Sequence, residues 1–236
     1  MNYFELGIVG GMGSKATAIF FDKLVERTEA TCDQEHISTI ILNHASLPDR
    51  TTAILSGEHD TFLSAIEKDF ALLSMIKPKA IAIPCNTSHY FYDDLKRMTD
   101  IPIINMIEET IFKCVATYGI QKPMVLLATD GTVQSGVYEK YAKANGLTVK
   151  RPDEEVQAFI MKTIYQDVKS GDPVDIKRLS KVIMNYVNRE GCSGVILGCT
   201  ELSTIDFNAT VSKYCIDAMD VLVETAIERS GHQLKY

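Results

Sequence analysis

Two of the six cysteines, Cys85 and Cys199, occupy positions where a thiol could do chemistry. Cys85 follows the short apolar segment 80–83, and Cys199 follows the similar segment 194–197. Each precedes hydroxyl-bearing residues and a helix-like segment. Both thiols are therefore expected near backbone N–H groups and the positive end of a helix dipole, a setting that lowers a thiol's pKa towards the thiolate.

Such thiols could serve two chemistries. A single cysteine could be a covalent nucleophile, which needs a partner base. His89 lies four residues after Cys85, although a surface or capping histidine is the favoured interpretation of it. Two opposed cysteines could instead racemise a carbon, because a thiolate on one face removes a proton while a thiol on the other returns one. Such a pair shares one proton in its reactive state, so its titrations should be coupled.

Alternating strand-like and helix-like segments surround these thiols. Strands are predicted at the apolar segments 4–9, 37–42, 80–83, 123–128 and 194–197. Helical patterns lie between them, at positions that include 61–75, 138–145, 153–169 and 175–189. This order predicts an α/β fold with parallel sheets covered by helices. The polar stretch 43–60 is long for a connection, and we expect it to be a loop that closes over a site.

The pattern of a glycine-containing turn, a later short strand and a cysteine occurs twice. Gly11 begins the first copy and Gly131 the second. We infer two similar lobes, each with a mostly parallel sheet flanked by helices. The first covers 1–105, with the C-terminal helix 216–236 packing on it, and the second covers 106–215. Open α/β sheets bind ligands at the carboxyl ends of their strands, so the active site is expected in the cleft between the lobes.

Composition excludes several classes of protein. The chain has 236 residues, of which 46% are hydrophobic and 23% charged, as in globular domains. The net charge is −7 and no basic cluster occurs, so no nucleic-acid partner is expected. The chain has no apolar stretch long enough for a membrane helix, and residues 1–5 lack signal-peptide features. No cysteines form a C-x-x-C pair, so we expect no metal site, and free thiols in a reducing cytoplasm.

Four motifs together resemble the aspartate/glutamate racemase family, most nearly its cofactor-independent aspartate racemases. They are residues 7–13, 84–89, 198–202 and 216–220. The resemblance spans nearly the whole chain and implies a two-lobed fold and racemisation of aspartate by a two-base cysteine mechanism. It also implies that no cofactor, pyridoxal phosphate included, is needed. A cytoplasmic homodimer acting on a small acidic amino acid is expected.

The resemblance further implies roles for particular residues. Cys85 and Cys199 would be the catalytic acid/base pair. Substrate-binding roles would belong to Gly11, Met12, Arg50, Asn86, Thr87, Lys169 and Thr200. Arg50 and Lys169 make physical sense, because an acidic protein must supply local cations to hold a dicarboxylate, and arginine can grip a carboxylate with two hydrogen bonds.

Some positions depart from the family pattern or leave a choice open. Ser14-Lys15 stands where many relatives carry Pro-Leu, and Ala218 replaces a frequent proline. Glu201 could orient a neighbour, tune Cys199, or be a structural cap. The remaining cysteines are interpreted as packing or surface thiols: Cys32, Cys114, Cys192 and Cys215. The turn 10–13 lacks the full spacing of a dinucleotide loop, so NAD is not expected.

Four other functions remain as alternatives. The nearest is glutamate or broad-specificity racemisation, because one methylene is a modest discrimination of about 1–3 kcal/mol. A decarboxylase or cis–trans isomerase is less favoured, because both cysteines are present. A non-catalytic amino-acid-binding protein and a redox-sensing thiol protein complete the set. The last would form a Cys85–Cys199 disulfide on mild oxidation.

Overall fold

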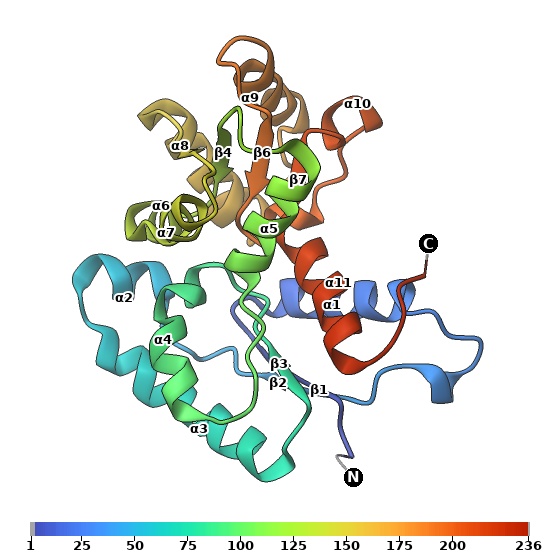
Figure 1. Cartoon of the computed structure of the whole chain (residues 1–236). Coiled ribbons are helices and arrows are strands. Elements are labelled where there is room, and N and C mark those ends of the chain that lie inside the picture. The colour runs from blue at the N-terminus through green and yellow to red at the C-terminus, as the bar shows by residue number, and fades with distance from the viewer. Residues whose placement is uncertain (1–2, 236) are drawn as a thin grey trace. The chain divides into compact units, whose positions relative to one another are not determined.

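The computed structural model describes residues 3–235 (Figure 1). Its chain divides into two compact units. Unit 1 contains the residues up to Met106 and those from Met219 onward, and unit 2 is Ile107–Ala218. Met1 and Asn2, which entered the signal-peptide expectation, and Tyr236, at the end of the predicted C-terminal helix, lie outside the described residues.

Unit 1 is built on a three-stranded parallel sheet. Its strands are β1 (Leu6–Gly10), β2 (Thr39–Asn43) and β3 (Ala80–Ala82), in the order β2-β1-β3. Leu6 pairs with Thr39 on one side and with Ala80 on the other. Every residue of β1 is buried, which fits a central strand covered on both faces.

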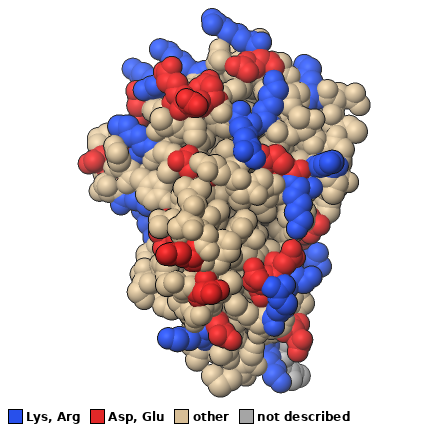
Figure 2. Space-filling model, turned by 90° about the vertical axis from the view of Figure 1, so that its left-hand side faces the viewer, with Lys and Arg blue, Asp and Glu red and all other residues tan. Residues whose placement is uncertain are grey.

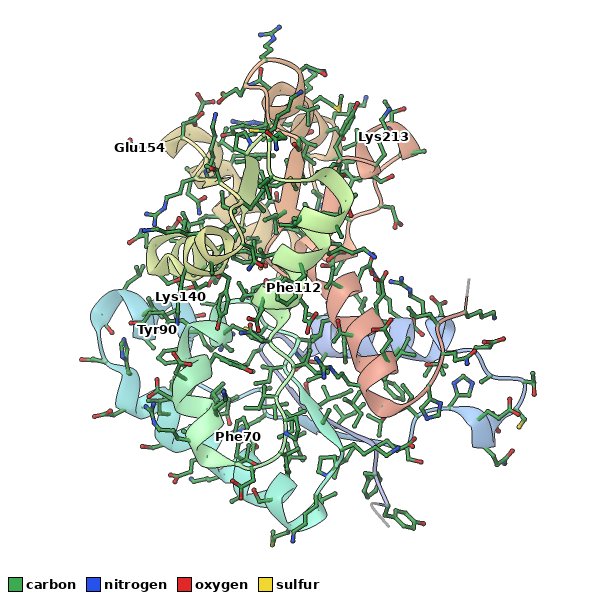
Figure 3. The ribbon with its side chains drawn as sticks, in the orientation of Figure 1. Phe70, Tyr90, Phe112, Lys140, Glu154 and Lys213 are labelled. Carbon is green, nitrogen blue, oxygen red and sulfur yellow. The ribbon has the colours of Figure 1, made fainter. Side chains whose placement is uncertain are left out.

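Helices cover both faces of this sheet (Figure 1). On one face α3 (His59–Ile76) packs so closely that a Cβ on Gly7 would lie 2.9 Å from a Leu73 methyl carbon. Phe70 of α3 is fully buried in this apolar layer (Figure 3). On the other side lie α1 (Ser14–Arg27) and α11 (Ala218–Ser230).

Ion pairs join α1 to α11. Lys23 Nζ lies 2.7 Å from Asp220 Oδ1, and Arg27 Nη2 lies 2.5 Å from Glu224 Oε1. These pairs are partly exposed and each contributes at most about 1 kcal/mol. The buried apolar side of α11 does more to attach it, and it includes Met219, Leu222, Val223, Ala226 and Ile227.

The remaining helices of unit 1 are short. They are η1 (Asp33–Glu35), α2 (Arg50–Ser56), η2 (Thr87–Phe91), α4 (Tyr92–Leu95) and η3 (Lys96–Met98). Helix η2 directly follows the Cys85 segment, and α2 lies within the stretch expected to be a loop.

Unit 2 contains a four-stranded parallel sheet. Its strands are β4 (Met124–Leu127), β5 (Val149–Lys150), β6 (Gly194–Leu197) and β7 (Cys215–Asp217), in the order β5-β4-β6-β7. Helices α8 (Glu154–Lys162) and α9 (Ile176–Asn188) form an apolar core with Val125, Leu127, Val195 and Leu197. The side chain of Leu126 lies towards α7 (Val137–Ala144), where Tyr138 is fully buried.

Five further helices complete the description of unit 2. They are α5 (Met106–Tyr118), α6 (Asp130–Ser135), the π-helix η4 (Thr163–Val168), η5 (Leu202–Thr204) and α10 (Ala209–Ser212). The predicted helix 153–169 is therefore α-helical only to Lys162, and its last turn is wider. Wide turns of this kind are frequent at functional sites.

The parallel α/β prediction is confirmed, but two local predictions are wrong. The stretch 43–60 is not one loop, because it contains α2 and the start of α3. Asp49 caps α2 by accepting a hydrogen bond from the Thr52 amide, and Gly57 ends it with a left-handed φ of 76°. The C-terminal helix begins at Ala218 rather than 216, since Cys215–Asp217 pairs with β6 as β7.

Charged side chains of both signs are spread over the surface in the view of Figure 2. On the face drawn in Figure 2, basic and acidic side chains are intermixed rather than gathered by sign. Within residues 3–235, no helix is long and apolar enough to cross a bilayer.

Candidate functional site

In each sheet the order in which strands are added reverses about one strand. Each predicted catalytic cysteine directly follows the first strand added on the other side. In unit 1, β2 and β3 lie on opposite sides of β1, and Cys85 comes just after β3. In unit 2, β5 and β6 lie on opposite sides of β4, and Cys199 comes just after β6. The connections diverge at such a switch point and leave a crevice at the carboxyl ends of the strands. Each unit thus presents one thiol where its own sheet would hold a ligand.

Arg50 is a buried cation in unit 1. Its Nη2 donates to the Met12 carbonyl at 3.0 Å and its Nη1 to the Pro48 carbonyl at 2.9 Å. The residue is 8% exposed, and among residues 3–235 no carboxylate forms an ion pair with it. A buried charge without a counter-charge is costly, so this guanidinium is suited to receive an anion.

The turn after β1 lies next to the Arg50 guanidinium. Gly11 has a φ of 90°, and a Cβ there would lie 2.4 Å from the carbonyl carbon of His44, so only glycine fits. The next residue, Met12, receives the Arg50 hydrogen bond through its carbonyl and another from Ser88 Oγ through its sulfur, at 3.1 Å. The structure therefore joins Gly11, Met12 and Arg50 to the segment that follows Cys85.

Asn86 and Thr87 directly follow Cys85 and are both buried. Ser88 was not among the predicted substrate-binding residues, although it lies in the quoted motif 84–89. Its bond to Met12 is what ties this segment to the β1 turn. A contact between residues 76 positions apart leaves no trace in local sequence patterns.

His89 is a structural residue rather than a base for Cys85. Its Nδ1 lies 2.9 Å from the Cys85 carbonyl oxygen, and its Nε2 accepts the Met106 amide at 3.2 Å. Burial lowers the pKa of His89, which keeps the imidazole neutral. Of the expected surface or capping histidine, the surface part is wrong, because His89 is buried; its ring bonds to the backbone at Cys85 and to the first amide of α5.

Cys199 in unit 2 contacts a carboxylate. Its Sγ donates to Glu201 Oε2 at 3.0 Å, and Thr200 Oγ1 lies 3.5 Å from the same oxygen. Lys169 Nζ lies 3.8 Å from Glu201 Oε1 and 4.3 Å from the centre of the Tyr165 ring. Cys199, Thr200 and Glu201 are all buried. Lys169 follows the π-helix, so the wide turn η4 carries this cation to the cysteine segment.

The pKa of Cys199 is raised well above its ordinary value. Burial is the main cause, and the charge of Glu201 together with the hydrogen bond it accepts adds to the effect. The expectation that a helix N-terminus would lower the pKa of Cys199 is therefore wrong. The helix that follows, η5, has three residues, and its dipole is weak beside a carboxylate in direct contact with the thiol.

Three further polar residues in this part of unit 2, Ser203, Asp217 and Tyr138, were not among the predicted site residues. Ser203 Oγ donates to Asp217 Oδ1 at 2.6 Å, which ties η5 to β7. The pKa of Tyr138 is raised well above its usual value by burial, and the nearby thiol of Cys199 adds to this. Asp217 lies in the quoted motif 216–220, and Tyr138 was placed only in the predicted helix 138–145.

The other four cysteines vary in exposure. Cys114 and Cys192 are buried, Cys215 is partly buried and Cys32 is exposed. Burial raises the pKa of both Cys114 and Cys215 to about 12, so these thiols are protonated at neutral pH.

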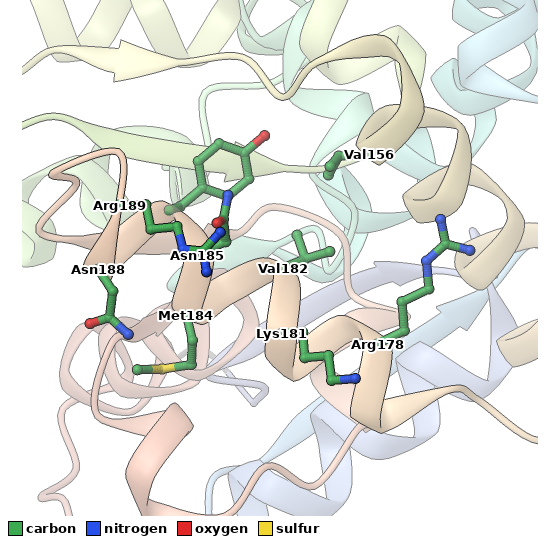
Figure 4. A pocket seen from close by; sticks show the side chains of 9 residues that line it. Val156, Arg178, Lys181, Val182, Met184, Asn185, Asn188 and Arg189 are labelled. Atoms are coloured by element: carbon green, nitrogen blue, oxygen red, sulfur yellow. The ribbon is translucent and has the colours of Figure 1, made fainter.

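Two surface pockets of unit 2 are lined by residues other than Cys199 and Lys169. One, of about 500 Å³, runs along α9 and is lined by Arg178, Lys181, Arg189 and neighbours (Figure 4). The other, of about 610 Å³, lies between α6 and α8 and reaches Tyr165. Tyr165, which lines this second pocket, is also the ring over which Lys169 Nζ lies.

Comparison with known proteins decides the family. Residues 9–226 match the family model described as Asp/Glu/hydantoin racemase. The chain belongs to the Asp/Glu/hydantoin racemase family. At the level of the family, this confirms the predicted resemblance and the expected isomerase of the amino-acid racemase type.

Individual relatives of this racemase-family chain carry different substrate names. The broad specificity amino-acid racemase RacX of Bacillus subtilis is 32% identical over 157 residues, which are 65% of this chain and 66% of RacX. The solved structure of Picrophilus torridus aspartate racemase is 30% identical, with a TM-score of 0.80 over 98% of this chain and 96% of that one. A glutamate racemase structure from Francisella tularensis is 18% identical, with a TM-score of 0.67 over 97% and 81% of the two chains. This last likeness concerns the fold alone.

Proposed function

We propose that this chain interconverts L- and D-aspartate without a cofactor, using Cys85 and Cys199 as the two bases. The observation that carries the proposal is the equivalent placement of these thiols. Each follows the strand at the switch point of a parallel sheet, in a chain of the racemase family. The mechanism requires that both thiols reach one substrate α-carbon, from opposite faces.

The reaction is two proton transfers. The thiolate of one cysteine takes the α-proton, so that the C–H bond breaks, an S–H bond forms and the electron pair stays on the carbon and its carboxylate. The thiol of the other cysteine then gives its proton to the opposite face of that carbon. Hydrogen bonds aimed at the carboxylate stabilise the charge that develops there. In this proposal Asn86, Thr87 and Thr200 supply such bonds.

The choice of aspartate rests on charge and on one relative. A dicarboxylate needs cations, and buried Arg50 has a guanidinium without a carboxylate partner among the described residues. Lys169 would supply a second positive charge, and Gly11 and Met12 would line the pocket. The aspartate racemase from Picrophilus torridus, aligned over almost the whole chain, favours the same substrate. RacX favours broad specificity as the second candidate.

The proposal extends to the setting of the enzyme. All six cysteines are free, which suits a reducing cytoplasm. We also propose a homodimer, as the family resemblance implies. Sedimentation analysis of the purified protein would test the homodimer directly.

The experiment is incubation with L-aspartate, and separately L-glutamate, in D₂O without added cofactor. NMR follows the α-proton and chiral chromatography follows the enantiomers. We expect exchange with formation of the D-enantiomer, fastest with aspartate. Racemisation should be lost in Cys85→Ser and in Cys199→Ser but kept in Cys32→Ser, which changes an exposed thiol. If neither amino acid exchanges its α-proton, the proposal is wrong.

A further inference from the structure

The contact between Glu201 and Cys199 makes the two proposed bases unequal. The Cys199 sulfur donates to a buried carboxylate oxygen at 3.0 Å. Within residues 3–235 no hydrogen bond of the Cys85 sulfur is described, and the nearby His89 is neutral and directed to backbone groups. A cysteine can donate a hydrogen bond to a carboxylate only while its thiol is protonated. The negative charge of the carboxylate also opposes ionisation of the thiol.

Resting on the proposed function, we propose that Glu201 is a positioning residue that keeps Cys199 protonated in the ligand-free protein. Cys199 then begins the cycle as the proton donor, and Cys85 begins it as the base. After one turnover the proton is on Cys85 and the negative charge is on Cys199, beside Glu201. The resting distribution returns when Cys85 passes a proton to solvent and Cys199 takes one up.

Other charged or titratable groups of unit 2 face this contact. Lys169 Nζ lies 3.8 Å from Glu201 Oε1. Its positive charge also acts on Cys199 in the direction opposite to that of Glu201. Tyr138, whose pKa is raised chiefly by burial, interacts electrostatically with both Cys199 and Asp217, and Asp217 accepts a hydrogen bond from Ser203. Among residues 3–235, the hydrogen-bond partner of the thiol is Glu201, whose carboxylate raises the pKa of Cys199 while its backbone hydrogen bond lowers it, so the carboxylate is the group to change.

The first test does not depend on activity. The rate at which iodoacetamide alkylates Cys199 is followed against pH by peptide mass spectrometry. The midpoint of this profile reports ionisation of the thiol, and its plateau reports access to it. In Glu201→Gln we expect a lower midpoint with an unchanged plateau, and alkylation about tenfold faster at pH values below both midpoints.

Two variants serve as controls. Glu201→Asp keeps the carboxylate and should keep a midpoint close to that of the unmodified protein. Glu154→Gln removes an exposed carboxylate from α8 and should change nothing. An unchanged midpoint in Glu201→Gln would overturn the inference. So would an equal fall in Glu201→Asp, because that would assign the effect to packing rather than to charge.

The second test uses the pH profile of kcat/KM. The reactive pair holds one proton, and Glu201 delays loss of the last proton from Cys199. The basic limb should therefore move to lower pH in Glu201→Gln, while the acidic limb, set by Cys85, stays in place. If Glu201→Gln racemises aspartate but its basic limb does not move, the role of Glu201 is contradicted and the proposed function is not. If the unmodified protein does not racemise aspartate at all, the proposed function is contradicted. The alkylation midpoint decides the ionisation of Cys199 in either case.

Discussion

Arg50, the cation proposed to bind the substrate, is held in place by the folded chain itself. Two backbone carbonyls fix its guanidinium, yet neither carries a negative charge. The free-energy cost of burying the cation is offset by folding of the chain, before any ligand binds. A carboxylate that binds there gains a charge-assisted contact without having to order a flexible side chain.

We expect Arg50→Met to lower kcat/KM for aspartate by about 10- to 100-fold, as follows from losing hydrogen bonds to a charged group worth about 1.5–3 kcal/mol. Arg50→Lys should restore little, because an ammonium group cannot make the same forked contact. Steady-state kinetics with thermal melts would separate binding from folding. Lys68→Met, which removes an exposed cation of α3, is the matched control and should leave kcat/KM unchanged. Equal kcat/KM in Arg50→Met and Lys68→Met would show that Arg50 does not bind the substrate.

Among the elements, the turn between β1 and α1 is the most constrained. It passes so close to the backbone at His44 that a single added carbon would collide with it. The same turn gives the Met12 carbonyl to Arg50. Distortion of the turn should therefore affect both stability and substrate binding.

The prediction compares two glycines with left-handed backbone. Gly11→Ala adds a clash to the strain of its φ of 90°, whereas Gly57→Ala, with a φ of 76° and open space around it, adds the strain alone. We expect Gly57→Ala to cost about 1 kcal/mol, or roughly 2–4 °C in Tm, and Gly11→Ala at least about twice as much. Calorimetry measures both. Similar melting temperatures would mean that the backbone at His44 gives way easily.

Sequence patterns predicted the elements whose signal is long or strongly apolar. The buried strands β1, β4 and β6 and the helices α3 and α9 fall close to their predicted ranges. Strands β5 and β7 were missed, because they are short and only partly buried and so lack the continuous apolar run that marks the equally short β3. Helix α2 was missed because Pro48, Gly57 and the polar residues between Asn43 and Asp60 outweighed the cap at Asp49.

The residue types of the candidate site could be proposed from the sequence, but the electrostatics around Cys199 could not. Motifs indicated Cys85, Cys199, Arg50 and Lys169. That Glu201 directs its carboxylate at the Cys199 sulfur depends on side-chain conformation and burial. Spacing of two residues along the chain is equally compatible with a side chain that points away.

At the scale of the whole molecule, the two units differ in how the chain builds them. Unit 2 is one continuous segment, Ile107–Ala218, whereas unit 1 needs two segments from opposite ends of the sequence. The second of these segments contributes α11, with several fully buried apolar side chains. Unit 2 therefore contains its whole core in one stretch of sequence, and unit 1 does not.

We expect residues 107–218, expressed alone, to fold and melt cooperatively, since their apolar core lies within the segment. A chain that ends at residue 218 should keep unit 2 folded but lose the tertiary structure of unit 1. Near-UV circular dichroism and amide NMR dispersion would report both. Joining residues 3–106 to 219–235 through a flexible linker should restore unit 1. An unfolded 107–218 segment would show that unit 2 depends on the rest of the chain.

The divided make-up of unit 1 has a consequence for synthesis on the ribosome. Translation completes unit 2 while α11 has not yet been made. Strand β1, which is translated before unit 2, must wait with one apolar side incompletely covered until α11 is released. The residues of β1 thus acquire their full set of neighbours only after the whole of unit 2 has been made.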